Sequence, residues 1–351
     1  MTKLLQDILR EPTQLAECAN RLITRKQELL QQAATLLSRD VVTYVVGVGS
    51  SWNAALAVAS MLNSLGYPAI AADASELQHF TDLPLGNSAI VLSRSGKSVE
   101  IVQLMKKFEQ AQTRLIGITN TPESLLAERS DVTFLLDSPF DHLISISMYS
   151  LLGLVGCLIA ETCNGTDLDV LRQDIADGLQ QAHDRLGLWQ AQLESADWIA
   201  AGGPVYFIAR GTSLASCHEA RLLWEEGAKA TATALTTGSF RHGSQEMIRL
   251  GVRVGLWIQD ETMREQDLEL AADLHSAGVS VLLVGTHLES SLADLVIDVP
   301  LMPRGWQFLT DIIPLQLAAE RTARVRGEDC DAFRFCPYII LDEGGLIEKS
   351  A

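Results

Sequence analysis

The residues best suited to bind a ligand lie in a short polar turn, residues 93–98, with the sequence Ser-Arg-Ser-Gly-Lys-Ser. The apolar run Ala89–Leu92 before it predicts a short buried strand, and Val99–Glu109 after it predicts a helix. Backbone N–H groups and hydroxyls at such a strand-to-helix turn favour a phosphate, and the two cations of the turn would add to its attraction. The alternative is a plain loop whose last serine caps the helix. The turn does not match the G-x-x-x-x-G-K-S/T phosphate loop.

A second set of reactive groups lies in the C-terminal half. Glu225 and Glu226 end a predicted helix, Ser216–Glu226, and residues 238–243 (Gly-Ser-Phe-Arg-His-Gly) form a loop that contains His242. A carboxylate and an imidazole in one site can move a proton between adjacent carbons of a sugar or open its ring. A solvated helix end and an ordinary loop histidine would look the same. We expect Glu225 to face solvent or to bind a substrate ammonium group.

The elements that must position the polar turn alternate between strands and helices. This alternation predicts an α/β fold with a parallel sheet covered on both faces. The predicted strands are Val41–Val48, Tyr67–Ala71, Ala89–Leu92, Leu115–Thr119 and Val132–Leu136, and the predicted helices are Trp52–Leu65, Ala74–Phe80, Val99–Ala111 and Ser124–Ser130.

The pattern repeats in the second half, which indicates two similar domains that arose by duplication. Gly49 and Gly211 are equivalent positions, 162 residues apart (211 − 49). Where the first copy has the polar turn, the second has residues 259–264 (Gln-Asp-Glu-Thr-Met-Arg), whose two carboxylates would repel a phosphate. We therefore expect only the first copy to hold one. The predicted strands here are Val205–Ala209, Val252–Ile258, Val279–Val284 and Leu295–Val299.

Five segments are expected along the chain. Residues 1–39 form N-terminal helices, with one helix ending before Pro12, and residues 166–199 form a connecting helix. The two α/β domains occupy residues 40–165 and 200–330, and residues 331–351 form a tail.

Bulk properties exclude several classes of partner. A net charge of −17 argues against nucleic acid or an anionic membrane. Met148–Ala160, the most apolar segment, is too short to cross a bilayer and predicts a buried helix. The six cysteines show no CxxC spacing, and the chain begins without a signal peptide, so we expect reduced thiols in a cytoplasmic protein without a metal or other cofactor. A dinucleotide fingerprint fails because its third glycine would fall at Trp52.

The repeat, the Gly-Val-Gly-Ser-Ser opening at residues 47–51, the turn at 93–98 and the loop at 238–243 resemble the double-SIS (sugar isomerase) proteins over nearly the whole chain. That group includes the isomerase half of glucosamine-6-phosphate synthase and the fructoselysine-6-phosphate deglycases. The resemblance implies two tandem SIS domains, each a five-stranded parallel sheet flanked by helices in a flavodoxin- or Rossmann-like three-layer sandwich. It implies that Glu226 is the acid/base group and that His242 is contributed across a homodimer interface, in a dimer or a dimer of dimers. The implied substrate-binding residues are Gly49, Ser50, Ser51, Ser93, Arg94, Ser95, Ser98 and Ser147.

Departures from the synthase pattern narrow the expected reaction. The chain starts at Met1 without a glutaminase domain, so ammonia transfer from glutamine is not expected. The lysine that precedes the synthase glutamate by three residues is Leu223 here, and the Schiff-base lysine of the tail falls at Tyr338, with Lys349 out of register. The Thr-Lys pair of the synthase corresponds to Ser147-Met148. This pattern resembles the deglycases.

We therefore expect an enzyme that cleaves a 6-phosphorylated fructosamine to a sugar 6-phosphate and a free amine. A ketose/aldose sugar-phosphate isomerase or an amino-sugar-phosphate deaminase is the first alternative, because it would use the same groups. A non-catalytic sugar-phosphate-binding regulator is the second, although the chain has no added DNA-binding domain. The sequence does not identify the amine or the sugar epimer.

Overall fold

The computed structural model describes residues 1–259, 262–336 and 338–345. It divides into two compact units that are not contiguous in sequence. The first-sheet unit comprises Gln14–Gln173 and the described tail residues from Ala332 onward. The second-sheet unit comprises Met1–Thr13 and Asp174–Asp331. The N-terminal residues and the tail therefore each belong to the unit that is more distant in sequence.

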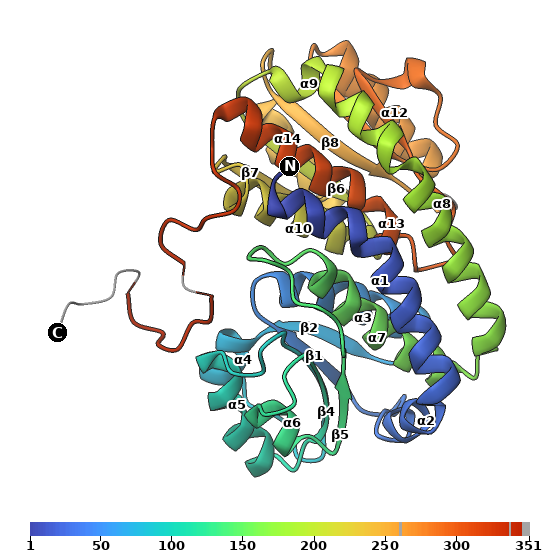
Figure 1. Ribbon diagram of the computed structural model, residues 1–351, viewed down its shortest axis with the longest axis vertical. Helices are drawn as coiled ribbons and strands as arrows, with labels where there is room; N and C mark the ends of the chain where they lie inside the picture. Colours follow the sequence, from blue (N-terminus) through green and yellow to red (C-terminus); the bar gives the residue numbers. More distant parts are fainter. Residues whose placement is uncertain (260–261, 337, 346–351) are drawn as a thin grey trace. The chain divides into compact units, whose positions relative to one another are not determined.

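The first-sheet unit contains a parallel sheet in the order β2 (Ala69–Asp73), β1 (Thr43–Gly47), β3 (Ser88–Leu92), β4 (Arg114–Thr119) and β5 (Val132–Leu135) (Figure 1). The chain passes from β1 outward to β2 and then crosses back to β3. The paired strands β1 and β3 are therefore followed by strands on opposite sides, β2 on one side and β4 on the other. Ligands of such sheets bind at this switch point, beyond the carboxyl ends of the strands. The helices of the unit are α2 (Gln27–Thr35), α3 (Ser50–Ser64), α4 (Ala74–Phe80), α5 (Val99–Gln110), α6 (Leu125–Arg129) and α7 (Ser147–Asn164).

Helices cover both faces of this sheet (Figure 1). On one face, Val46, Val91 and Leu115 pack in a common core with residues of α4, α5 and α6. On the other, α3 and α7 pack together, and Gly156 lets α7 approach closely, since a Cβ there would lie 2.5 Å from a methyl group of Val58. All residues of β1 and β3 are buried for this reason. The predicted α/β sandwich is confirmed.

The apolar segment Met148–Ala160 lies within α7, whose residues from Ser147 to Thr162 are all buried. The predicted buried helix is confirmed. No helix among the described residues is long and apolar enough to span a membrane.

The predicted helix end before Pro12 is wrong. Helix α1 runs without a break from Lys3 to Arg25, with Pro12 inside it. A proline in a helix interior costs about 3 kcal/mol because it removes a hydrogen bond and crowds the preceding turn. Fully buried side chains such as Ile8 and Leu15 lie on either side of it, and each contributes roughly 1.5–3 kcal/mol of burial. Burial along the whole helix therefore outweighs the local proline effect.

The second-sheet unit repeats the same topology, in the order β7 (Ala232–Thr236), β6 (Val205–Ala209), β8 (Arg253–Ile258), β9 (Ser280–Gly285) and β10 (Leu295–Asp298) (Figure 1). Here β6 and β8 occupy the places of β1 and β3, and the predicted duplication of the fold is confirmed. The helices after α7 are α8 (Leu168–Ser195), α9 (Asp197–Ala200), α10 (Ser213–Glu226), α11 (Thr237–Arg241), α12 (Arg264–Ser276), α13 (Phe308–Asp311) and α14 (Ile313–Arg326).

Strand β7 had no counterpart among the individual strands expected from the sequence. Its residues, Ala-Thr-Ala-Leu-Thr, include a single large apolar side chain, and only Ala232 is buried. As an edge strand it pairs with β6 alone, in the register Val205↔Ala232. A half-exposed edge strand needs no apolar run, so the usual sequence signal is weak there.

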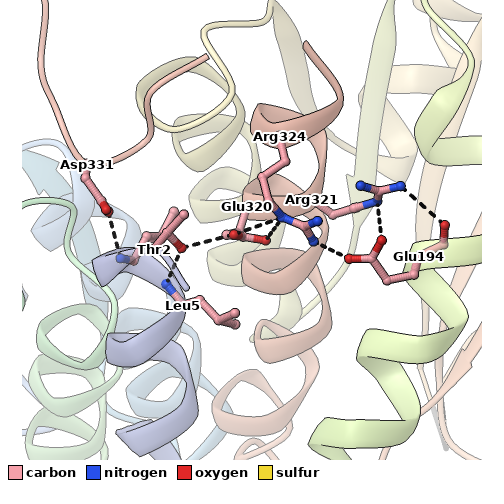
Figure 2. Close-up of polar contacts among 8 residues, drawn as sticks. Thr2, Leu5, Glu194, Glu320, Arg321, Arg324 and Asp331 are labelled. Carbon is pink, nitrogen blue, oxygen red and sulfur yellow. Dashed lines mark hydrogen bonds and ion pairs between the residues drawn. The ribbon is translucent and has the colours of Figure 1, made fainter. Parts of the chain in front are cut away.

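Polar contacts join the end of the second-sheet unit to its first residues (Figure 2). The carboxylate of Asp331 accepts hydrogen bonds from the backbone N–H groups of Lys3 (2.8 Å) and Leu4 (2.9 Å). The hydroxyl of Thr2 donates to Glu320 (3.0 Å). Because the first N–H groups of a helix have no partner within it, Asp331 serves as a cap for α1. The point at which the tail leaves this unit is thereby fixed.

Candidate functional site

Two loops meet at the carboxyl edge of the first sheet. Residues 48–49 connect β1 to α3, and residues 93–98 connect β3 to α5. Since β1 and β3 are paired strands, with Val46 opposite Val91, the two loops lie next to each other at the switch point. The structure thus brings Gly49, Ser50 and Ser51 together with the polar turn.

Glycine shapes both loops. A Cβ at Gly47 would lie 2.4 Å from the carbonyl carbon of Ser51, so the start of α3 approaches this backbone more closely than any other residue would allow. Gly96 has a φ of +60°, and a Cβ there would meet the hydroxyl oxygen of Ser124 at 2.4 Å. Both contacts keep the loops tight against the end of the sheet.

Two serines of the turn are used to hold its shape. The hydroxyl of Ser93 accepts a hydrogen bond from the Gly96 N–H (3.0 Å), and that of Ser95 accepts one from the Lys97 N–H (3.2 Å). Both side chains are nearly buried. Each hydroxyl keeps its own hydrogen to donate, so these serines can order the turn and still contact a ligand.

Other donors at this edge are uncommitted. Within the described residues, the hydroxyls of Ser51 and Ser98 have no hydrogen-bond partner, and both side chains are partly exposed. Ser98 precedes the first helical residue of α5 without capping it. Hydroxyls beside two helix starts, α3 and α5, provide the kind of surroundings that an anion prefers.

The turn also carries positive charge. In the part of the chain that the structure describes, no carboxylate pairs with Arg94 or with Lys97, and the Lys97 side chain is exposed. The Arg94 guanidinium instead donates to the backbone carbonyl of Leu143 (3.3 Å). Two cations that form no ion pair among the described residues are notable in a chain whose net charge is −17, and they favour an anionic ligand at this edge.

Ser147, the remaining residue expected at the substrate, is the first residue of α7 and is fully buried. Its hydroxyl donates to Gln14 (2.5 Å), and its backbone N–H donates to Asp141 (3.2 Å). In this structure the buried hydroxyl is bonded to Gln14, and Asp141 caps the start of α7.

The corresponding edge of the second sheet is filled by the chain itself. Gln259 follows β8 as Ser93 follows β3, and its amide donates to the carbonyl of Arg210 (3.2 Å) and to the hydroxyl of Ser213 (3.0 Å). The carboxyl group of Asp311 accepts hydrogen bonds from Ser213 (2.6 Å) and Ser216. Burial raises the pKa of Asp311 to about 7. An internal amide and carboxyl group thus bond to Ser213, whereas the equivalent Ser51 of the first sheet has no hydrogen-bond partner for its hydroxyl among the described residues.

The loop that follows β6 nevertheless has the same backbone shape as its counterpart. Gly49 and Gly211 have φ values of +56° and +58°. Asp260 and Glu261, the carboxylates expected to repel a phosphate, lie outside the described residues. Their role stays a prediction. Gln259 and Asp311 supply a second reason to expect no phosphate at this sheet, which the sequence had not indicated.

Glu226 and His242 belong to the second-sheet unit. Glu226 is the last residue of α10 and is half-buried. Two residues before it in the sequence, the ring of Trp224 packs edge-on against Phe207 with centroids 5.2 Å apart. Glu225 pairs with Arg221 (2.5 Å), which gives it a partner on its own helix, while burial raises the pKa of Glu225.

His242 follows α11 directly and is exposed. Since α10 runs antiparallel to the strands, Glu226 lies toward the edge where β7 begins, whereas α11 starts at the edge where β7 ends. Five residues of strand span about 17 Å. The topology of one chain therefore places these two residues toward opposite ends of the strands of the second sheet.

None of the six cysteines forms a disulfide in the described part of the chain, and four of them are buried. Burial raises the pKa of Cys18 and of Cys163 to about 11, which makes both thiols unreactive near neutral pH. Among the described residues, no cluster of three or more His, Cys, Asp or Glu side chains is arranged to hold a metal ion.

Comparisons with known proteins agree with this fold. Residues 37–155, which include both loops of the first sheet, match the family described as SIS domain. The glutamine–fructose-6-phosphate aminotransferase (isomerizing) of Pyrobaculum aerophilum is 26% identical over 342 residues, which cover 93% of this chain and 55% of that protein. The chain spans about half the length of the curated relatives it matches.

Two solved structures have the same fold. The C-terminal domain of glucosamine-fructose-6-phosphate aminotransferase from Francisella tularensis superposes with a TM-score of 0.84 at 16% identity, covering 94% of this chain and 97% of that one. Glucosamine-6-phosphate deaminase from Thermotoga maritima gives 0.79 at 20% identity, covering 97% and 99%. The resemblance expected from the sequence is confirmed: residues 37–155 match the SIS domain family, and a second sheet of the same topology follows them.

Proposed function

We propose that this chain is a phosphosugar-processing enzyme and that the edge of its first sheet holds the substrate phosphate. The observation that carries the proposal is the contrast between equivalent serines. Ser51 has an uncommitted hydroxyl within the described residues, whereas Ser213, its counterpart two residues after the loop glycine, is bonded to both Gln259 and Asp311. Together with Ser98 and the two cations of the turn, Ser51 supports a phosphate site in one sheet only.

The reaction we propose is the cleavage of a 6-phosphorylated fructosamine. His242 would assist opening of the sugar ring, and Glu226 would take a proton from C1 of the open-chain sugar and return one to C2. As the nitrogen loses its proton and the C2 oxygen gains one, the product is an imine between the amine and C1, with a hydroxyl group at C2. Water then adds to the imine carbon, and the C–N bond breaks to release the amine and glucose 6-phosphate. A well-placed proton transfer contributes roughly a hundred- to ten-thousandfold in rate.

The loss of lysines supports cleavage over amine transfer. Leu223 and Tyr338 stand where the resemblance places lysines of the synthase, and Leu223 is buried in α10. A chain without these lysines keeps the groups for proton transfer and lacks those for a covalent Schiff base with the sugar.

A second candidate is an isomerase or deaminase of sugar phosphates. The relative from Pyrobaculum aerophilum is named as isomerizing, and the structural neighbour from Thermotoga maritima is named a deaminase. Either reaction would use the same phosphate site and the same proton transfer.

We further propose that Glu226 and His242 act together across two copies of the chain. Their separation along the second sheet supports this arrangement. Glu226→Gln and His242→Gln proteins should each be inactive. Co-expression or subunit exchange should restore about one quarter of the unsubstituted activity, because half of the dimers are mixed and each mixed dimer has one intact site of two. No recovery on verified exchange would place both residues in one chain's site.

The reaction itself is tested by NMR of the products. The purified protein is incubated separately with 6-phosphofructose-lysine, fructose 6-phosphate and glucosamine 6-phosphate. Lysine and glucose 6-phosphate from the first compound would support the deglycase. Conversion of the simple sugar phosphates alone would favour the isomerase or deaminase. Three unchanged compounds, with one of them raising the unfolding temperature, would favour a regulator.

A further inference from the structure

The C-terminal strap, defined here as residues 338–343, lies on the polar turn of the first-sheet unit. The Arg94 guanidinium stacks on the ring of Tyr338, 4.1 Å from its centroid, and donates a hydrogen bond to the backbone carbonyl of Tyr338 (3.0 Å). Two residues further on, the carbonyl of Ile340 accepts a hydrogen bond from the N–H of Val99, the first residue of α5 (3.0 Å). The strap therefore contacts both the turn and the helix that follows it.

The backbone of Arg94 is fixed as firmly as its side chain. Its carbonyl accepts hydrogen bonds from the Asn120 N–H (3.0 Å) and from the Thr119 hydroxyl (3.2 Å), both at the end of the neighbouring strand β4. An arginine side chain loses rotamer entropy when it is immobilised. Here Tyr338 and Leu143 immobilise it before any ligand is bound.

All groups that hold the Arg94 side chain are electrically neutral. Two of its five N–H groups donate to backbone carbonyls, and the aromatic ring covers one face. The described residues supply no carboxylate to balance its charge. Three N–H groups and the full positive charge remain for a ligand beside Ser93 and Ser95.

The outer end of the strap is held more weakly. Glu343 lies 3.1 Å from the ring nitrogen of His79 and 3.4 Å from the hydroxyl of Ser75. The Glu343 and His79 side chains are 29% and 40% exposed, and exposed ion pairs of this kind contribute little. The contacts that fix the strap on the turn are thus those of Tyr338 and Ile340.

We propose that Tyr338 is a positioning residue: its ring and carbonyl hold Arg94 at the polar turn, ready to bind the phosphate of a sugar phosphate. This proposal rests on the proposed function, since it assigns a role to a residue near the same phosphate site. In the synthase pattern this position holds a Schiff-base lysine. In this chain its tyrosine would instead help Arg94 to bind the phosphate.

The test is a double-mutant cycle on binding, which does not depend on turnover. Calorimetric titration with glucose 6-phosphate, and with glucose as the unphosphorylated control, is performed on the full chain. Arg94→Ala and Tyr338→Ala should each weaken glucose 6-phosphate binding about tenfold. Tyr338→Phe keeps the ring and the carbonyl and should bind within about twofold of the unsubstituted chain. Tyr338→Leu keeps the bulk without the aromatic face and should behave as the alanine variant does.

The decisive result is the coupling. If Tyr338 acts through Arg94, the double variant should bind no more weakly than Arg94→Ala alone. Phe335→Ala, which removes an exposed aromatic ring earlier in the tail, is the matched control and should leave affinity unchanged.

Additive losses, or unchanged affinity in Tyr338→Ala and Tyr338→Leu, would overturn the positioning role while the phosphate site stands. Equal binding of glucose and glucose 6-phosphate by the unsubstituted chain would overturn the phosphate site, and the positioning role with it.

Discussion

The amide of Gln259 donates a hydrogen bond to the hydroxyl of Ser213, at 3.0 Å, across the switch point of the second sheet. In the first sheet the equivalent residues are Ser93 and Ser51, and within the described residues Ser51 is uncommitted. The two sheets have the same strand order and the same glycine turn. They differ in that the serine hydroxyl after the turn is bonded within the protein only in the second sheet, as far as the described residues show. That difference supports the proposed phosphate site at the first sheet and argues against one at the second.

Serine substitutions should separate binding from stability. Ser51→Ala and Ser98→Ala remove hydroxyls that have no partner among the described residues, so each should weaken glucose 6-phosphate binding about tenfold with little change in the unfolding temperature. Ser213→Ala removes a donor to a buried carboxyl group and should lower the unfolding temperature without changing affinity. Calorimetric titration and thermal unfolding of the three variants measure both effects. Weaker binding in Ser213→Ala alone would place the phosphate on the second sheet.

Asp311 should make stability depend on pH. Its pKa is raised by burial from 3.8 to about 7, so the folded protein keeps a proton that the unfolded chain releases within that window. Stability from this group is therefore present at low pH and falls as the pH rises toward 7, by at most about 1.4 kcal/mol per pH unit. Asp311→Asn cannot titrate. The unfolding temperature of the unsubstituted chain, minus that of Asp311→Asn, should decrease across the window, and a constant difference would contradict the burial argument.

The comparison with the variant is needed because His218 acts in the opposite direction. Burial, with a further contribution from Arg221, lowers its pKa from 6.5 to about 4. Stability from the neutral imidazole is present above 6.5 and is lost as the pH falls through about 4. In the unsubstituted chain the two effects partly cancel, and only the difference between proteins isolates Asp311.

Gly47→Ala should damage both fold and site. The added methyl group would lie 2.4 Å from the backbone of Ser51, which cannot rotate away as a side chain could. Overpacking of this kind costs about 1–3 kcal/mol, and the forced shift of α3 should also weaken phosphate binding. Gly187→Ala in α8 is the matched control, since no described atom beyond its own helix backbone and chain neighbours lies within 4 Å of the new methyl group. It should raise the unfolding temperature slightly, because alanine is favoured in a helix by about 0.5–1 kcal/mol. Equal unfolding temperatures in the two variants would count against the close approach at Gly47.

The local sequence pattern predicted much of the fold and the position of the polar turn. The turn at residues 93–98 lies where the alternation of apolar runs placed it, and α4 has the bounds expected from its sequence. Long-range pairs were not visible in the sequence. Asp311 contacts Ser213 98 residues away, and the carbonyl of Tyr338 contacts Arg94 244 residues away. Hydrophobic periodicity reports which face of an element is buried, and it carries no information about which distant polar groups meet there.

The most direct test of the central claim is a crystal structure of the full chain soaked with glucose 6-phosphate. The phosphate should lie at the carboxyl edge of the first sheet, within hydrogen-bond distance of the Ser51 and Ser98 hydroxyls, with Arg94 still stacked on Tyr338. The edge between β6 and β8 should keep Gln259 bonded to Ser213 and remain free of phosphate. A phosphate bound at the second sheet would contradict the assignment of the phosphate site. So would the absence of phosphate from the carboxyl edge of the first sheet at saturating glucose 6-phosphate.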